Sequence, residues 1–150
     1  MIYGCYCSPN VDADAFDRFV AVLGGDVRRQ RKSVILAGDL NAKTSEWGSI
    51  TEDARGATVM YWVNGAGLVV LNRGGRPTFV RYEQRSWIYV TLCTEGVAGK
   101  IKNWSVQEEE ETLGWHRIIS FEFWGSKRPT TSRRTTGWRV NEGRLSAFRE

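Results

Sequence analysis

The sequence contains few cysteines and no long hydrophobic run. Its three cysteines, Cys5, Cys7 and Cys93, are an odd set without metal-site spacing, so we expect reduced thiols within strands. A zinc site would need all three to converge on His116, the single histidine, and the spacing does not favour one. No apolar stretch approaches the roughly 20 residues that span a bilayer, and no secretory signal is recognisable at the N-terminus. The sequence therefore predicts a soluble, intracellular protein without a disulfide framework.

The positive charge of the chain is concentrated toward its C-terminus. Residues 126–150 hold seven basic and two acidic residues, which leaves 14 basic and 15 acidic residues in residues 1–125. The segment 126–137 is also poor in apolar residues and is expected to be disordered. Such a segment suits contact with a phosphate backbone and equally suits a solvated linker. The chain as a whole is 41% hydrophobic and has seven Trp residues, enough for the core of one domain.

Hydrophobic periodicity predicts helices early in the chain and strands later. Apolar residues recur at helical spacing in residues 14–23, and Gly24 and Gly25 should end that helix. A second helix is expected at residues 53–64, with Gly65 as its stop. Strands are expected at residues 2–7, 34–38, 68–72, 78–81, 87–93, 101–107 and 116–124. This order predicts an α/β sandwich, in which two sheets pack face to face with the helices outside.

An acid and an amide two positions apart come after the apolar run at residues 34–36. They are Asp39 and Asn41 in the segment 37–41, which reads Ala-Gly-Asp-Leu-Asn. Side chains two apart at a strand end point to the same face, so a carboxylate able to hold a hard cation lies beside an amide able to orient a phosphate or a water. Metal-assisted phosphoester cleavage requires such a pair. The alternative is a strand that ends in an Asx turn, with Asn41 capping the next segment of the chain.

Several further segments accompany this pair in a specific order. They are residues 6–10 (YCSPN), 38–49 (GDLN and its continuation), 53–56 (DARG), 67–72 (GLVVLN), 77–79 (PTF), 86–94 and 109–123. Through these segments the chain resembles the endonuclease/exonuclease/phosphatase family, and in particular the endonuclease domain of insect-type non-LTR retrotransposons. The resemblance runs nearly end to end. It implies part of a four-layer α/β sandwich, with two packed, mainly antiparallel sheets and outer helices.

The resemblance assigns catalytic roles to four residues. Asp39 and Asn41 match the pair that orders the attacking water and contacts the scissile phosphate, and Asp39 is also the expected Mg²⁺ ligand. Tyr6 matches a phosphate-contacting tyrosine, although a Tyr in a strand is as readily a core or rim residue. His116 matches the histidine that stabilises the pentavalent phosphorane, where a single His would otherwise be read as an ordinary surface residue.

Two carboxylates of the family pattern are replaced. Tyr89 stands where the Ser-x-Ile-Asp motif ends, and Trp115 stands where the Ser-Asp-His motif has its Asp. Neither a phenol nor an indole acts as a carboxylate at pH 7. The second Asp would accept the hydrogen bond of the histidine, so its loss is expected to leave His116 unoriented.

Other metal-binding acids are scarce. The resemblance places an Asn and a metal-binding Glu on segments that would precede Met1. The acids near helix starts, where capping or a dipole role is the expected use, are Asp12, Asp14, Glu52 and Asp53. The run Glu108–Glu111 is expected to be a solvated turn. A site built on Asp39 alone should therefore bind Mg²⁺ poorly.

We therefore expect residues 1–125 to be the C-terminal two-thirds of an endonuclease domain, truncated and degenerate, and residues 126–150 to be a connector toward a reverse transcriptase. The resemblance implies Mg²⁺-dependent nicking of target DNA, in the nucleus for the intact family, and we expect little or no such activity in this chain. One alternative is an active enzyme in which Glu46, Glu83 or Glu109 completes the metal site.

Two further alternatives are not catalytic. A nucleic-acid-binding remnant would use Arg128, Arg133 and Arg134 of the basic segment. The tryptophans available to stack on bases would be Trp104, Trp115, Trp124 and Trp138. The other possibility is a chain without a role that does not fold stably, because its strand edges are open.

Overall fold

The computed structural model describes residues 1–30, 32–108, 112 and 114–125. The elements in these residues are, in order, β1 (Ile2–Tyr6), α1 (Ala13–Arg29), β2 (Ile35–Asp39), the 3-10 helix η1 (Ser45–Trp47), α2 (Ala54–Gly65), β3 (Leu68–Val70), β4 (Phe79–Arg81), β5 (Gln84–Ser86), β6 (Tyr89–Thr94), α3 (Glu95–Ala98), β7 (Ile101–Val106) and β8 (Ile119–Phe123). The predictions for the basic segment 126–150, including its connector role and its arginines, fall outside the described residues.

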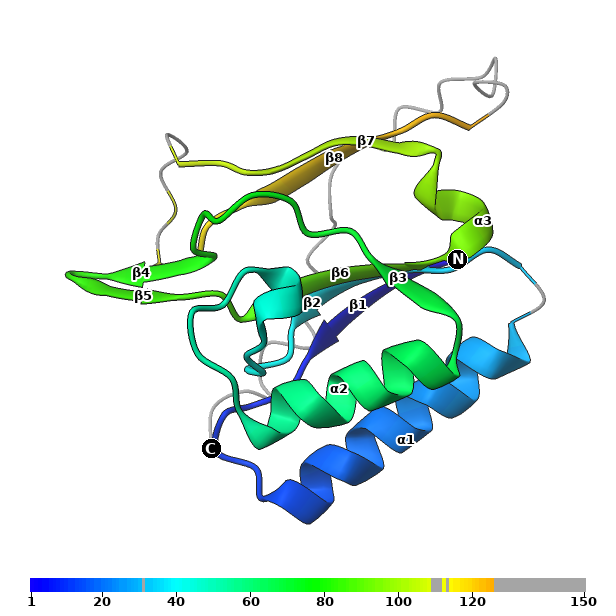
Figure 1. The fold of residues 1–150 in the computed structure, drawn as a ribbon, viewed down its shortest axis with the longest axis horizontal. Coiled ribbons are helices and arrows are strands. Elements are labelled where there is room, and N and C mark those ends of the chain that lie inside the picture. The colour runs from blue at the N-terminus through cyan, green and yellow to red at the C-terminus, as the bar shows by residue number, and fades with distance from the viewer. Residues whose placement is uncertain (31, 109–111, 113, 126–150) are drawn as a thin grey trace, which may run out of the picture.

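Four strands form the central sheet, in the order β1-β2-β6-β3. β1 pairs in parallel with β2, whereas β6 runs antiparallel to both β2 and β3. Two antiparallel pairs, β4–β5 and β7–β8, lie outside this sheet. Figure 1 shows α1 and α2 side by side on one face of the central sheet and the β7–β8 layer on the other. The predicted α/β sandwich with packed sheets and outer helices is confirmed.

Strand alternation divides the core into two layers. Leu36 of β2 and Leu92 of β6 belong to the cluster that includes the buried residues of α1 and α2. Their chain neighbours Ile35 and Cys93 belong to a second cluster with Val97, Ile101, Trp104 and Val106, on the side of β7. Because successive side chains of a strand point to opposite faces, β2 and β6 are covered on both sides. The ends of β2 and β6 therefore belong to strands that are buried on both faces.

Helix α1 is longer than the sequence predicts. It begins after Asp12, whose Oδ1 accepts a hydrogen bond from the Ala15 backbone N–H at 2.7 Å, but it continues through Gly24 and Gly25 to Arg29. The predicted stop at the glycine pair is wrong. A Cβ at Gly24 would lie 2.6 Å from Nε1 of Trp62 in α2, so this glycine permits close helix packing rather than ending the helix.

Helix α2 agrees with its prediction. Asp53 is its N-cap, with Oδ1 accepting from the backbone N–H groups of Gly56 at 2.7 Å and Lys43 at 3.0 Å. The expected inward side chains Val59, Trp62 and Val63 are buried. The capping roles expected for Asp12 and Asp53 are thus confirmed, because both carboxylates satisfy helix N–H groups that have no partner within the helix.

The strands differ from prediction around residue 87. The strand expected at 87–93 begins two residues late: β5, which was not predicted, ends at Ser86, and β6 begins at Tyr89 after an interruption at residues 87–88. The N–H groups of Ile88 and Tyr89 donate to Oγ1 of Thr78, at 3.0 and 3.1 Å, which diverts the backbone from the β4–β5 ladder. The short helix α3 has no counterpart in the prediction. β8 also starts at Ile119, three residues after the expected His116.

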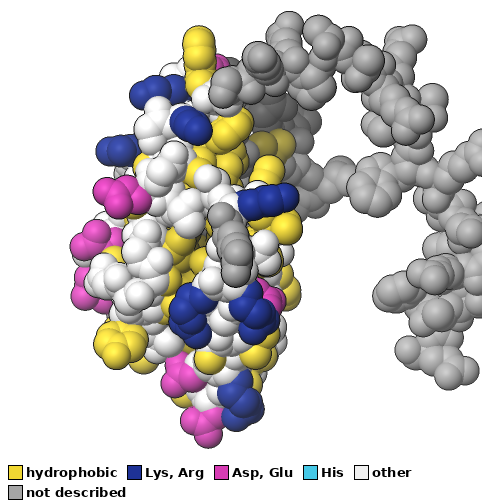
Figure 2. All heavy atoms as spheres, turned by 90° about the vertical axis from the view of Figure 1, so that its right-hand side faces the viewer, with side chains coloured by type: hydrophobic (Ala, Val, Ile, Leu, Met, Phe, Trp, Pro, Cys, Tyr) yellow, Lys and Arg dark blue, Asp and Glu magenta, His cyan; other side chains and the backbone are white. Residues whose placement is uncertain are grey.

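The three cysteines are free thiols, as expected. On the face seen in Figure 2, Lys and Arg side chains are interspersed with Asp, Glu and hydrophobic side chains, so neither sign of charge dominates it. None of the helices in the described part of the chain is both long and apolar enough to cross a membrane.

Candidate active site

Three strand ends meet at one edge of the central sheet. In the sheet register Asp39, the last residue of β2, lies directly opposite Tyr6 of β1 and Tyr89 of β6. The preceding Gly38 is required by close strand contact, because a Cβ there would lie 1.8 Å from the Cys5 carbonyl oxygen. The Gly-Asp part of the motif therefore has a packing reason as well as a chemical one.

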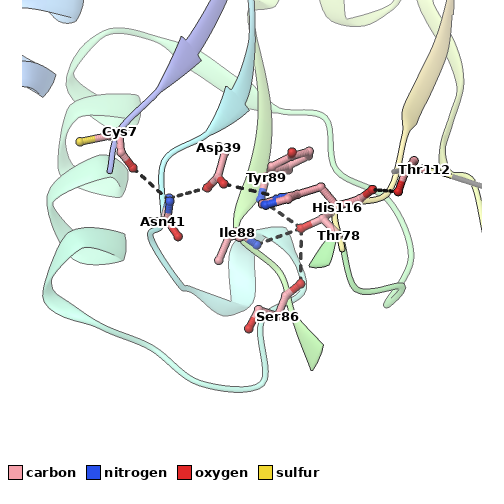
Figure 3. A network of polar contacts seen from close by, with 9 residues as sticks. All are labelled: Cys7, Asp39, Asn41, Thr78, Ser86, Ile88, Tyr89, Thr112 and His116. Carbon is pink, nitrogen blue, oxygen red and sulfur yellow. Dashed lines mark hydrogen bonds and ion pairs between the residues drawn. The ribbon is translucent and has the colours of Figure 1, made fainter. Parts of the chain in front are cut away.

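Asp39 and Asn41 are held by hydrogen bonds at the end of β2 (Figure 3). Oδ1 of Asp39 accepts from the Asn41 backbone N–H at 2.9 Å, and the Asn41 side-chain Nδ2 donates to the Cys7 carbonyl at 3.0 Å. Asn41 has φ of 46°, a left-handed conformation that Asn tolerates better than most residues. The strand therefore ends in an Asx turn, with Asp39 as the acceptor. Asn41 does not cap the next segment, because its side chain bonds back to Cys7 and Thr44 is the N-cap of η1. The turn does not conflict with the chemical interpretation, since Oδ2 of Asp39 takes no part in it.

His116 faces this free oxygen. Its Nδ1 lies 3.9 Å from Oδ2 of Asp39, within ion-pair range when the imidazole is protonated. The ring stacks on Tyr89 with centroids 5.5 Å apart and planes inclined by 16°, and it meets Phe79 edge to face at 4.9 Å. The ring thus has contacts with two aromatic rings and lies near a carboxylate, although the Asp of the motif is replaced.

Backbone contacts place the His116 segment beside β4. Phe79 and His116 form an isolated bridge, Val80 N–H donates to the Trp115 carbonyl at 2.9 Å, and Arg117 N–H donates to the Thr78 carbonyl at 2.8 Å. The hydroxyl of Thr112 donates to the His116 carbonyl at 2.8 Å.

Thr78 is a site residue that the sequence reasoning missed. It is 1% exposed, and its Oγ1 accepts from the N–H groups that begin β6 while its backbone holds the His116 segment. Thr78 thus joins the strand that carries Tyr89 to the segment that carries His116 (Figure 3). Its place in the segment 77–79 was the available signal, because that segment was already recognised as part of the pattern.

The electrostatics of the site centre on the buried Asp39, which is 6% exposed. Burial raises the pKa of its carboxyl group, and the Asn41 N–H, nearby His116 and the Asn41 side chain oppose that rise only in part. Burial and the neighbouring Asp39 charge also raise the pKa of Tyr89, so its phenol is neutral at pH 7. The arrangement brings one carboxylate, one amide and one imidazole together at the end of β2.

The other predicted site residues differ in how close they lie to Asp39. Tyr6 is opposite Asp39 in the β1–β2 register, and it is 65% exposed at the end of β1, which is a rim position. Trp115 packs its ring against Tyr82, with centroids 5.2 Å apart. Trp104 is buried and donates from Nε1 to Thr91 Oγ1 at 3.0 Å, so its expected role in base stacking is wrong. Trp124 is 69% exposed, and Trp138 lies outside the described residues.

The His, Cys, Asp and Glu side chains of the described residues do not form a dedicated metal site. Within residues 1–30, 32–108, 112 and 114–125, no group of three or more His, Cys, Asp or Glu side chains is arranged to hold an ion. The replacement candidates Glu46 and Glu83 therefore do not join Asp39 and His116 in such a group, and Glu109 is not among the described residues. Glu108 instead pairs with Arg117 at 2.6 Å and with Arg76 at 3.4 Å. Mg²⁺ prefers an octahedron of oxygen ligands, and Asp39 supplies only part of one.

Comparisons with known proteins give this arrangement a context. The family described as endonuclease-reverse transcriptase matches residues 1–120. The fold is similar to the "Endonuclease domain of TRAS1, a telomere-specific non-LTR retrotransposon", with a TM-score of 0.69 and 31% identity over 79% of this chain and 52% of that one. The chain thus spans about half the length of that domain. No curated protein matches the sequence.

Two further structures share the fold at lower identity. They are the 3′-5′ exonuclease NExo from Neisseria meningitidis, with a TM-score of 0.64 and 16% identity, and a variant of the 3′ phosphatase NExo from Neisseria bound to product DNA hairpin, with a TM-score of 0.64 and 15% identity. Each match covers 81% of this chain and 60% of the other.

Proposed function

Because the chain belongs to the endonuclease-reverse transcriptase family, we propose that it is a catalytically impaired remnant of a Mg²⁺-dependent DNA endonuclease. The reaction of the intact site would be hydrolysis of a DNA phosphodiester, a nick that leaves a 3′-hydroxyl primer for a reverse transcriptase, in the nucleus. The observation that carries the proposal is the convergence of Asp39, Asn41 and His116 at the end of β2. One of the neighbours bears a DNA product, which supports DNA as the substrate class.

Asn41, His116 and Tyr6 would have different roles in this reaction. The Asn41 amide is fixed by its bond to Cys7, and would contact the scissile phosphate or the attacking water. His116, when protonated, would donate from Nε2 to the oxygens that gain charge in the transition state, and Tyr6, at the exposed rim, would contact a phosphate of the bound strand. Mg²⁺, when bound, would act as a Lewis acid at the phosphate. Among the described residues, Asp39 would be the one to hold it.

Impairment follows from the substitutions at positions 89 and 115. Two acidic positions of the pattern hold Tyr89 and Trp115, and the described residues bring no second carboxylate into a metal-binding group with Asp39. Removal of one catalytic group typically costs 10² to 10⁴ in rate, as an order of magnitude. The proposed activity is therefore low or absent even when the chain is folded.

The test is nicking of supercoiled plasmid by the purified chain in Mg²⁺, with EDTA and Asp39→Ala as controls. Nicking at or near background from a sample that circular dichroism shows to be folded would support impairment. Robust nicking that both controls abolish would refute it and would favour the active alternative, in which a replacement acid such as Glu46, Glu83 or Glu109 completes the site.

A non-catalytic nucleic-acid-binding function is the second candidate. It rests on the excess of basic residues in 126–150, among them Arg128, Arg133 and Arg134, and on the exposed ring of Trp124. Basic residues give salt-sensitive affinity for a phosphate backbone, and exposed aromatic rings stack on bases. This function would survive the loss of the catalytic acids.

A further inference from the structure

The His116 ring lies against two aromatic rings from separate strands. Tyr89, the first residue of β6, stacks on it almost in parallel, at 5.5 Å and 16°, and Phe79 of β4 meets it edge to face at 4.9 Å. The backbone bridge between Phe79 and His116 fixes the segment to which the ring is attached. These contacts restrict rotation of the imidazole, although its side chain is 45% exposed.

The restricted ring presents one particular nitrogen to Asp39. Nδ1 is the atom that lies 3.9 Å from Oδ2 of Asp39, whose side chain is 7% exposed. Tyr89 is directly opposite Asp39 in the β2–β6 register, so one residue stands beside the carboxylate and stacks on the imidazole (Figure 3). A negative carboxylate near Nδ1 favours the proton on that nitrogen, since it attracts the N–H dipole and repels a lone pair.

We propose, on the basis of the proposed function, that Tyr89 is a positioning residue that stacks on His116 and keeps its Nδ1–H directed at Asp39. The neutral imidazole then carries its lone pair on Nε2, the nitrogen that faces away from Asp39. Stacking by Tyr89 thereby performs the orienting role for which the family pattern uses an additional carboxylate. Asp39, within ion-pair range of Nδ1, supplies the negative charge in place of that carboxylate.

The aromatic ring of Tyr89 carries this role, and its hydroxyl does not. Within the described part of the chain, the Tyr89 hydroxyl forms no hydrogen bond, whereas the backbone of Tyr89 donates to Thr78 Oγ1 and accepts from Asn72 Nδ2. A phenylalanine would keep the same ring on the same backbone. Tyr89→Phe should therefore preserve the orientation of His116, and Tyr89→Leu should lose it.

The single histidine permits a direct test by NMR. Long-range proton–nitrogen correlation on the ¹⁵N-labelled full chain, in EDTA and at a pH where the imidazole is neutral, reports which ring nitrogen carries the proton. The expected result is a predominant Nδ1–H form in the unaltered chain and in Tyr89→Phe, and loss of that predominance in Tyr89→Leu. Tyr61→Leu is the matched control, because Tyr61 is 85% exposed on α2; it should behave as the unaltered chain does.

A predominant Nε2–H form in the unaltered chain, or an unchanged Nδ1–H form in folded Tyr89→Leu, would overturn the proposal. Should Tyr89→Leu fail to fold, the unaltered chain still decides, through its tautomer and through nuclear Overhauser contacts between the Tyr89 and His116 rings. The readout requires no DNA cleavage, so it stays separate from the plasmid assay. If residual nicking is measurable, Tyr89→Leu should lower kcat while leaving KM unchanged, and Tyr89→Phe should restore kcat.

Discussion

At the scale of single residues, the most consequential feature is a carboxylate held where water barely reaches it. Asp39 receives one backbone N–H and faces one imidazole, yet the net effect of its surroundings is a raised pKa, with burial as the dominant cause. The ionised form is therefore less favourable in the folded chain than in the unfolded chain. The site retains Asp39 at a cost in stability.

This cost predicts how Asp39→Asn changes stability with pH. Between the ordinary carboxyl pKa of 3.8 and the raised pKa of Asp39, the folded chain binds more protons than the unfolded chain, so stability falls as pH rises through that interval. Asn carries no charge and can still accept from the Asn41 N–H. We expect Asp39→Asn to be more stable than the unaltered chain at pH 7, and the difference to shrink as pH is lowered toward 3.8.

Urea denaturation at a series of pH values measures this difference. Asp14→Asn, in the first turn of α1, is a control that should stay within about 0.5 kcal/mol of the unaltered chain. A less stable Asp39→Asn at pH 7 would mean that the contacts with Asn41 and His116 outweigh the burial of the charge.

Residue identity alone predicted part of the site. The strand-end pair Asp39 and Asn41 could be read from the sequence, because the alternation of a strand and the segment order place both at one edge. The orientation of His116 could not, since it depends on rings contributed by Phe79 and Tyr89 across long sequence separations. The substitution at position 89 indicates a lost acid, and only the packing reveals what the new side chain contacts.

At the scale of elements, α1 and α2 illustrate how one sequence signal can have two meanings. Gly24 and Gly25 look like a helix stop, yet the helix continues through both. The two glycines are not equivalent, because a Cβ at Gly24 would meet Trp62 Nε1 at 2.6 Å, whereas a Cβ at Gly25 meets only Arg29 Nη1 at 3.5 Å. Sequence periodicity does not report such a contact between helices.

This difference predicts opposite effects for two alanine substitutions. Gly24→Ala should lower the free energy of unfolding by about 1 to 3 kcal/mol, the usual cost of overpacking. Gly25→Ala should raise it by about 0.5 to 1 kcal/mol, because Ala is the better residue within a helix. Urea denaturation of the two variants gives both values, and each serves as the control for the other. An equal increase in the free energy of unfolding of both variants would contradict this prediction, because it would show that Trp62 shifts without cost.

At the scale of the whole molecule, the layer order followed from the sequence better than the strand boundaries did. Helices early and strands late were enough to predict the sandwich, because amphipathic helices and half-buried strands have few ways to cover one another. The interruption at residues 87–88 was not predictable, since it depends on Thr78 bonding to β6 from another segment. The separation of charge along the chain is the other molecular property that sequence alone provides.

That charge separation predicts where DNA affinity lies. Residues 1–125 have nearly balanced charge, so deleting residues 126–150 should abolish salt-sensitive DNA binding while leaving the folded domain intact. Fluorescence anisotropy with a labelled duplex measures the affinity at several salt concentrations. The slope of log affinity against log salt concentration should approach about −0.9 for each phosphate neutralised. Unchanged affinity and slope after the deletion would eliminate the nucleic-acid-binding candidate that rests on this segment.

The conformation of Asn41 gives this residue a structural use besides its proposed chemical one. A left-handed φ of 46°, the bond from its amide to the Cys7 carbonyl and the bond from its N–H to Asp39 together make positions 39 and 41 part of the frame that joins β1 to β2. Replacement of Asn41 should therefore damage folding as well as any chemistry, whereas Asp39→Asn keeps an acceptor for the Asn41 N–H. The presence of Asn41 in a related chain is thus explained by the backbone alone and does not by itself indicate cleavage.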